Sequence, residues 1–242
     1  MKESHADIID FDFEALLPAD RYRLLTNFVV PRPIALVSTR STDGQNNAAP
    51  MSFFNVFSHD PPIIILGIQS RPDGCEKDTM TNIRRTGEFA VNMVDRAIAN
   101  EMIICGANFN SGVDEFAVSG LTSVFGSKVN VPLALESPCT MECRVERIID
   151  YPRRAIILGE VLSMHVRRSC LDKNVHYVNP EEYQPIARMH ADNYILSGEQ
   201  FSLRKPVALE GDDIPNPAGR VDSAKDLTNS NSATQSTSKA CI

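Results

Sequence analysis

The stretch CTMECRVERIIDY, residues 139–151, decides the fold class, because apolar and polar side chains alternate along it. Cys139, Met141, Cys143 and Val145 occupy every second position. Successive side chains of a strand point to opposite faces, so this pattern is typical of an antiparallel strand with one buried face. The two cysteines stand roughly 13 Å apart along such a strand. We therefore expect them to be small core residues, and we expect no metal site.

Five further segments are rich in Val, Ile and Phe and are bounded by Gly, Pro, Asn or Asp. They are PIALVSTRS (33–41), SFFNVFS (52–58), PPIIILGIQ (61–69), EFAVNMVD (88–95) and AIILGEVLSMHVR (155–167). Two shorter segments predict helices, each ending at a glycine: DTMTNIRRTG (78–87), with Asp78 as N-cap, and RAIANEMIICG (96–106). Several strands with few helices favour a closed or half-open β-barrel over a parallel α/β sheet. The chain also lacks a G-x-G-x-x-G dinucleotide fingerprint between a strand and a helix.

The chain has 242 residues and a formal net charge of −7, with the excess acid at its two ends. Residues 1–19 form an acidic segment, residues 20–206 the body, and residues 207–242 a polar tail that we expect to be disordered because it buries little apolar surface. The body has no basic stripe and no membrane-spanning run, so we expect neither nucleic-acid nor membrane binding. The N-terminus has no secretory signal and no cysteines form a C-x-x-C pair, which predicts a cytoplasmic protein with reduced thiols.

A lysine, an aspartate and a threonine, Lys77, Asp78 and Thr79, stand at the start of the first expected helix. The N-terminus of a helix presents unpaired backbone N–H groups and the positive end of its dipole, which suit a phosphate. The Lys77 ammonium and the Thr79 hydroxyl would complete such a cradle, and Arg84 or Arg85 would add charge from the side. Taken alone, however, these residues are better explained by an ordinary helix cap with Lys77 in water.

A second stretch, GQNNAAPMSFFNVFSHDPP (44–62), places small and polar residues in an expected loop after a strand. Small side chains there let a flat ligand approach the backbone closely. The Ser52 hydroxyl and the amides of Met51 to Phe53 suit the carbonyl and nitrogen edge of a ring system. A β-hairpin with a proline-containing bend is the structural alternative.

These blocks together resemble the flavin reductase-like family, of the flavoredoxin type. The resemblance covers roughly residues 20 to 200 and rests on the order and spacing of five blocks. They are YRLLTNFVVPRPIALVST (22–39), NAAPMSFFNVFSHDPPIIILGI (47–68), KDTMTNIRRTGEFAVN (77–92), IILGEVLSMHV (156–166) and YQPIARMHADNYI (183–195). The resemblance implies a mainly β fold, an FMN-binding split β-barrel of Greek-key type with six strands and a few short helices, which pairs as a homodimer.

The resemblance also implies which residues contact FMN. The small-residue loop binds the flavin ring and ribityl chain largely through backbone groups, and the Lys-Asp-Thr start of the helix grips the phosphate. Two arginines contact the phosphate or the ribityl chain, and one asparagine faces the cofactor. In chain order these residues are Arg32, Ala49, Pro50, Met51, Ser52, Phe53, Lys77, Asp78, Thr79, Asn92 and Arg188.

Two departures from the family pattern concern the electron donor and the loop after the last block. Met189-His190-Ala191 stands where many members have glycines, and Arg153-Arg154 stands where many reductases have a histidine that assists nicotinamide docking. Arg154 is therefore the candidate contact to a pyrophosphate or to a different donor.

The implied function is that of an FMN-dependent oxidoreductase, which passes hydride from NAD(P)H through bound FMN to a flavin or another small-molecule acceptor, or to a partner oxygenase. No catalytic side chain is expected, because flavin N5 carries the chemistry. Two alternatives remain open. One is a flavin-binding electron carrier without its own nicotinamide site, and the other is a non-catalytic split-barrel binding module.

Overall fold

The computed structural model describes residues 8–175, 177–197, 201 and 203. Nearly all of them belong to one compact unit, Met1–Glu199. The tail that the sequence predicts to be disordered, 207–242, lies outside the described residues.

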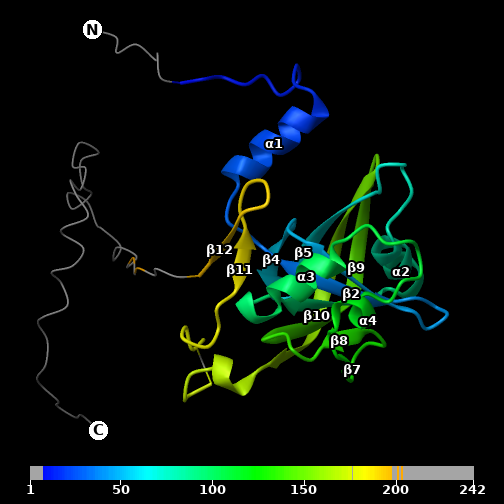
Figure 1. The fold of residues 1–242 in the computed structure, drawn as a ribbon, viewed down its shortest axis with the longest axis vertical. Helices are drawn as coiled ribbons and strands as arrows, with labels where there is room; N and C mark the ends of the chain where they lie inside the picture. Colours follow the sequence, from blue (N-terminus) through cyan, green and yellow to red (C-terminus); the bar gives the residue numbers. More distant parts are fainter. Residues whose placement is uncertain (1–7, 176, 198–200, 202, 204–242) are drawn as a thin grey trace, which may run out of the picture. The chain divides into compact units, whose positions relative to one another are not determined.

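One antiparallel sheet of seven strands forms the body of this unit, in the order β3-β2-β6-β9-β10-β5-β4 (Figure 1). The long strands β9 and β10 run side by side and are joined by a two-residue turn. The strands are β2 (Ala35–Arg40), β3 (Asn46–Met51), β4 (Phe54–His59), β5 (Pro62–Gln69), β6 (Glu88–Met93), β9 (Cys139–Tyr151) and β10 (Arg154–Val166).

The two edge strands of this sheet, β3 and β4, are consecutive in the chain and are joined only by Ser52 and Phe53. So short a link spans at most about 10 Å, so the two edges lie close together and the sheet curls on itself. The backbone N–H of Gly67 in β5 donates to the carbonyl of Phe53 at 2.8 Å, which fastens the link to the strand behind it. The prediction of a mainly β, barrel-like fold is confirmed.

The sheet has seven strands where the sequence predicts six, because the segment expected as a loop contains β3. Its Asn, Ala and Pro residues have low strand propensity, and they show no alternation. The strand forms because a hairpin with β2 supplies its hydrogen bonds, with Val37 opposite Ala49 and Arg40 opposite Asn46. As an edge strand it has one partner only, so Pro50, which has no N–H, is tolerated there.

The helices are short and lie outside the sheet. They are α1 (Pro18–Phe28), α2 (Asp78–Thr86), α3 (Ala99–Cys105) and α4 (Glu115–Ser119), with 3-10 turns η1 (Arg96–Ile98) and η2 (Arg168–Cys170). The helix predicted at 78–87 is confirmed as α2, which buries Met80 and Ile83 in the core and ends at Gly87 in the left-handed conformation. Its N-cap, however, is Lys77 and not Asp78, which is already the first helical residue.

Two small sheets complete the unit. β1 (Arg32–Pro33), β11 (Ile186–Arg188) and β12 (Tyr194–Leu196) form one, and β7 (Ser123–Phe125) and β8 (Pro132–Ala134) form the other. Cys139 and Cys143 are buried in β9 as small core residues, as predicted. Among the described residues, no helix is long and apolar enough to cross a membrane, and no cluster of metal-ligating side chains occurs.

Candidate functional site

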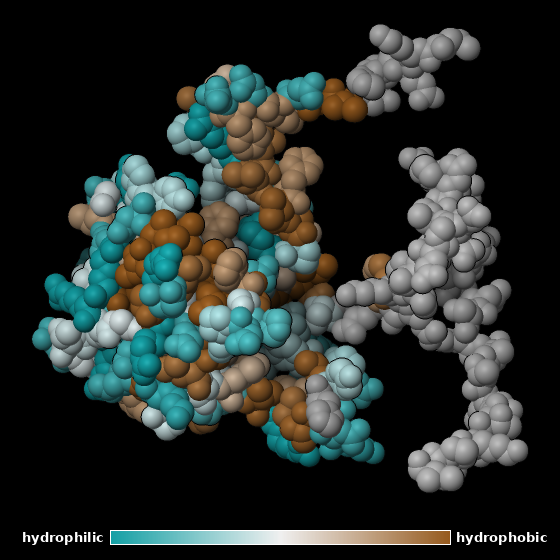
Figure 2. Space-filling view, turned by 180° about the vertical axis from the view of Figure 1, so that it is seen from behind, coloured by the Kyte–Doolittle hydropathy of each residue, from teal (hydrophilic) through white to brown (hydrophobic). Residues whose placement is uncertain are grey.

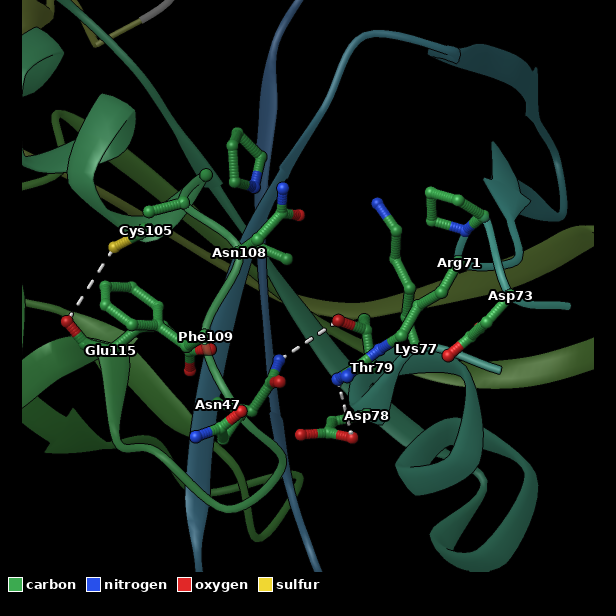
Figure 3. A pocket seen from close by; sticks show the side chains of 16 residues that line it. Asn47, Arg71, Asp73, Lys77, Asp78, Thr79, Cys105, Asn108, Phe109 and Glu115 are labelled. Carbon is green, nitrogen blue, oxygen red and sulfur yellow. Dashed lines mark hydrogen bonds and ion pairs between the residues drawn. The ribbon is translucent and has the colours of Figure 1, made fainter. Parts of the chain in front are cut away.

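A cavity of about 360 Å³ lies between β3 and the start of α2 (Figure 3). Its walls come from β3, from residues 71–79, from residues 105–110 at the end of α3 and just after it, and from Glu115 of α4. Five of the residues that the sequence assigns to a cofactor line it together: Ala49, Pro50, Lys77, Asp78 and Thr79.

The corner of this cavity at the start of α2 favours an anion. No side chain among the described residues caps the helix, so its first backbone N–H groups remain available. Figure 3 shows the Lys77 side chain extending from the helix start, and it has no hydrogen bond or ion pair with any described residue. Partial burial, and after it the charge of Arg71, lower the pKa of the Lys77 ammonium. An anion placed beside it would relieve both effects.

Asp78 positions its neighbours in the cavity wall. Its carboxylate accepts hydrogen bonds from Arg71 Nη2 at 3.2 Å, from Ser111 Oγ at 3.0 Å and from the backbone N–H of Gly112 at 3.2 Å. Asp78 thereby holds a second cation, Arg71, in the cavity wall and fastens the loop around residue 111.

Arg71 was not predicted as a site residue, whereas Arg84 or Arg85 was expected to add charge from the side. Arg84 instead pairs with Glu76 at 2.8 Å and with Asp150, and it does not line this cavity. A tight turn around Gly74, with a φ of +91°, folds the chain back and brings Arg71 beside the helix start. The Pro-Asp-Gly sequence that follows Arg71 is the one signal of this turn.

Two further polar contacts join β3 to the helices around it. The Asn47 amide donates to Thr79 Oγ1 at 3.0 Å, and both residues are buried. Glu115 Oε2 accepts a hydrogen bond from the backbone N–H of Ala48 at 3.0 Å, while burial raises the pKa of this carboxyl. Neither was expected at the site: Asn47 begins the family block 47–68 but was not among the predicted contacts, and Glu115 belongs to none of the five blocks.

Three predicted residues, Arg32, Arg188 and Asn92, do not line this cavity. Arg32 is buried and donates to the backbone carbonyls of Thr26 at 2.6 Å, Val29 at 3.1 Å and Met189 at 3.1 Å, and it faces Arg188 across the β1–β11 pair. These contacts join α1 to the small sheet, away from the cavity lining.

Asn92 is fully buried within the sheet. Its amide donates to the Leu36 carbonyl at 2.9 Å and to Ser38 Oγ at 3.0 Å, and its oxygen accepts from the Ala134 N–H at 2.8 Å. The side chain is therefore occupied in joining strands, and it does not line the cavity.

The remaining predicted residues continue from β3 towards a neighbouring hollow. Met51 packs in the main core, and Ser52 lies in the link between β3 and β4. The Phe53 ring stands edge-on to Tyr22 of α1, with centroids 6.4 Å apart. Phe53 and Arg154 line a hollow of about 250 Å³ that is separate from the first cavity.

Comparisons with known proteins bear on the fold and on the family of the chain. The model of the flavin reductase like domain matches residues 27–187. The chain is similar to the solved structure of 2-nitrobenzoate 2-nitroreductase from Pseudomonas fluorescens, with 32% identity and a TM-score of 0.76 over 84% of this chain and 100% of that one. It is equally similar to nitrilotriacetate monooxygenase component B from Bacillus cereus, with 31% identity and a TM-score of 0.77 over 81% of this chain and 98% of that one.

A third solved structure bears on the fold alone. It is a protein with a split barrel domain from Shewanella frigidimarina, which is 21% identical with a TM-score of 0.70 over 83% of this chain and 100% of that one. The curled seven-stranded sheet is therefore a split barrel. With the family model covering most of the described body, the chain belongs to the flavin reductase-like family.

Proposed function

We propose that this flavin reductase-like protein is an FMN-dependent oxidoreductase that accepts hydride from NAD(P)H. The observation that carries the proposal is the Lys77 ammonium, which lies without a partner among the described residues at the uncapped start of α2, inside a cavity with a second cation, Arg71. When bound, FMN supplies hydride acceptance and electron transfer, which no side chain of the cavity provides.

The residues present fit FMN. Lys77, the Thr79 hydroxyl and the first N–H groups of α2 would hold the phosphate, with Arg71 beside them and Asp78 fixing the position of Arg71. Ala49 and Pro50 of β3 present small side chains along one wall, where a flat ring system can approach the backbone.

The electron acceptor is proposed from the names of two similar proteins. One solved relative is named a nitroreductase and another a monooxygenase component. We therefore propose that the acceptor is a small organic molecule or a flavin used by a partner oxygenase. We also propose a homodimer, because α1 and the edge strand β4 leave Phe28, Val56 and Phe57 largely exposed.

The test combines cofactor identification with single-turnover kinetics. We expect the purified protein to be yellow, mass spectrometry of the released cofactor to find FMN, and stopped-flow mixing with NADH or NADPH without oxygen to bleach the flavin absorbance. If the purified protein is colourless and binds no added FMN, the alternative of a non-catalytic binding module is the correct one. If the protein binds FMN but neither NADH nor NADPH reduces it, the alternative of an electron carrier without its own nicotinamide site is the correct one.

A further inference from the structure

A second cavity, of about 370 Å³, lies between the small β7–β8 sheet and the place where β9 starts and β10 ends. It shares no lining residue with the proposed FMN cavity, so the two are separate sites. Its volume is within the range of small-molecule sites, which is about 300–1,000 Å³.

Two polar side chains of the long hairpin lie next to each other in this cavity. Thr140 of β9 and His165 of β10 are directly opposite in the strand pairing, so their side chains leave the same face of the sheet. Glu142, two residues further along β9, is on this face as well. Its neighbours Met141 and Cys143 pack in the main core, so the cavity lies on the other side of the sheet.

The Glu142 carboxylate fixes the orientation of the imidazole. Glu142 is fully buried, and its Oε1 lies 2.8 Å from His165 Nε2. The carboxylate also accepts hydrogen bonds from the backbone N–H groups of Ser127 at 3.3 Å, Lys128 at 2.7 Å and Val129 at 3.0 Å. Burial acts to raise the pKa of this carboxyl, but the hydrogen bonds from His165 and the three amides outweigh it and hold the pKa below its ordinary value. Glu142 is therefore an ionised acceptor.

This arrangement leaves two polar atoms without partners. In the neutral imidazole Nε2–H donates to Glu142, so Nδ1 is an acceptor, and it has no hydrogen bond with a described residue. The Thr140 side chain is only 5% exposed, and its hydroxyl also has no hydrogen-bond partner among the described residues. A buried polar group without a partner is costly, so both atoms favour a ligand that pairs with them.

The other walls of the cavity are mostly apolar. Phe125 and Leu135 are 50% and 60% exposed, so an apolar group in the cavity would cover surface that now faces water. Arg167 is the one arginine, lysine or acid among the described residues that line the cavity, and its guanidinium already donates to the Glu136 carbonyl and lies 3.9 Å from Asp95 Oδ2. A neutral ligand therefore fits these walls better than an ion.

We propose that this cavity binds a phenol, a small aromatic molecule with one hydroxyl group, whose O–H donates to His165 Nδ1 while its oxygen accepts from the Thr140 hydroxyl. The ring would lie against Phe125 and Leu135. A carboxylate fits less well, because it offers acceptors only and would face the Nδ1 lone pair. The site does not depend on the proposed flavin chemistry.

Calorimetric titration of the full-length protein at pH 8 tests the site with three probes of similar shape. p-Cresol can donate and accept, 4-methylanisole can only accept, and toluene can do neither. A binding-site atom left unpaired corresponds to about a tenfold loss of affinity. We therefore expect 4-methylanisole to bind about tenfold more weakly than p-cresol, and toluene to bind more weakly still.

Thr140→Val removes the hydroxyl and keeps the branched shape. We expect p-cresol affinity to fall about tenfold and toluene affinity not to fall. The melting temperature should not decrease, because the hydroxyl has no hydrogen bond with a described residue. Thr122→Val is the matched control, since Thr122 is an exposed threonine that does not line the cavity, and it should leave p-cresol affinity unchanged.

Four outcomes would overturn the proposal. Toluene binding as tightly as p-cresol would show an apolar hollow without a polar site, and no effect of Thr140→Val on p-cresol would place the ligand elsewhere. No binding of p-cresol would mean that water suffices for the two polar atoms. Loss of p-cresol binding when FMN is added would place it in the FMN cavity. The titrations are also possible without FMN, so a chain that binds no FMN would refute the proposed function and leave this test intact.

Discussion

At the scale of single residues, Lys77 is a cation in a corner that partly excludes water, without an acidic partner among the described residues. Replacing it with alanine removes no hydrogen bond or ion pair with a described residue, so we expect the melting temperature to change little. FMN affinity should fall about tenfold to a hundredfold, since a charge-assisted hydrogen bond contributes about 1.5–3 kcal/mol. Titrating FMN against both proteins, followed by flavin fluorescence, measures the loss.

Riboflavin is the internal control for this change, because it lacks the phosphate. Its binding should hardly respond to Lys77→Ala. Lys77→Arg should restore only part of the FMN affinity, since a planar fork replaces a compact charge. Equal, small effects on FMN and riboflavin would show that Lys77 is a solvated helix-start residue.

The buried carboxyl of Glu115 should make the stability of the fold depend on pH. Burial raises its pKa in the folded protein above the ordinary value, and the hydrogen bond from Ala48 opposes this only in part. Between the ordinary and the raised pKa the folded state binds more protons than the unfolded state, so this residue lowers the free energy of unfolding as pH rises. Glu115→Gln removes the charge and keeps an oxygen for the Ala48 N–H.

The stability gained by Glu115→Gln, relative to the wild type, should therefore be larger at pH 8 than at pH 4. Urea unfolding at the two pH values measures it. A difference between the proteins that does not change with pH would show that Glu115 titrates normally in the fold.

The predicted residues that line the cavity lie in two short continuous runs, Ala49-Pro50 and Lys77 to Thr79. Lys77, Asp78 and Thr79 are neighbours in the chain, so their common position at a helix start follows from local signals. Arg71 and Asn47 reach the same cavity through a glycine turn and a strand pairing, respectively. Contacts of this kind depend on tertiary structure, and a single sequence does not display them.

At the scale of elements, Gly159 sets how closely β10 packs against the ring of Phe89. A Cβ at residue 159 would lie 2.3 Å from Phe89 Cζ, and Phe89 is fully buried. Gly159→Ala should lower the free energy of unfolding by about 1–3 kcal/mol, since a well-packed core accepts an extra methyl group only by strain. Urea denaturation measures the change.

A second substitution identifies the cause. Phe89→Leu shortens the side chain that the new methyl group meets, so Gly159→Ala should cost less in a Phe89→Leu background than in the wild type. Additive effects of the two substitutions would place the cost of Gly159→Ala in the backbone and not in this contact.

The strands that the sequence predicts correctly are those with a strong pattern of their own, above all β9, β10 and β5. β3 lacks β-branched and aromatic residues, and it forms because β2 lies beside it. The N-cap predicted for α2 is one residue too late, and tertiary contacts again explain the difference. Aspartate is a common N-cap residue. Here, however, the Asp78 carboxylate accepts hydrogen bonds from Arg71 and Ser111.

At the scale of the whole molecule, exposed apolar side chains predict association. Phe28 of α1 is 78% exposed, and Val56 and Phe57 of the edge strand β4 are each 68% exposed. Figure 2 shows hydrophobic side chains gathered where α1 meets the body of the unit. An edge strand with exposed apolar residues is a ready surface for a second copy of the chain.

We expect sedimentation velocity to show a dimer for the wild type and a monomer for Phe57→Glu at the same concentration, because a charge at this edge opposes burial. Val118→Glu, on an exposed apolar residue of α4, should leave the dimer intact and serves as the control. A wild type that sediments as a monomer would contradict the proposed homodimer.

The pairing of β5 with β10 has a consequence for synthesis of the chain. Ile63 lies opposite Glu160 and Gln69 opposite Arg154, so the partners are separated by 85 to 97 residues. When the apolar run of β5 leaves the ribosome, its hairpin partner β4 has already emerged, but its other neighbour has not yet been translated. One edge of this strongly hydrophobic strand therefore stays unpaired until β10 has been translated. We expect chaperone binding to matter most during that interval, because an unpaired apolar strand is prone to aggregate.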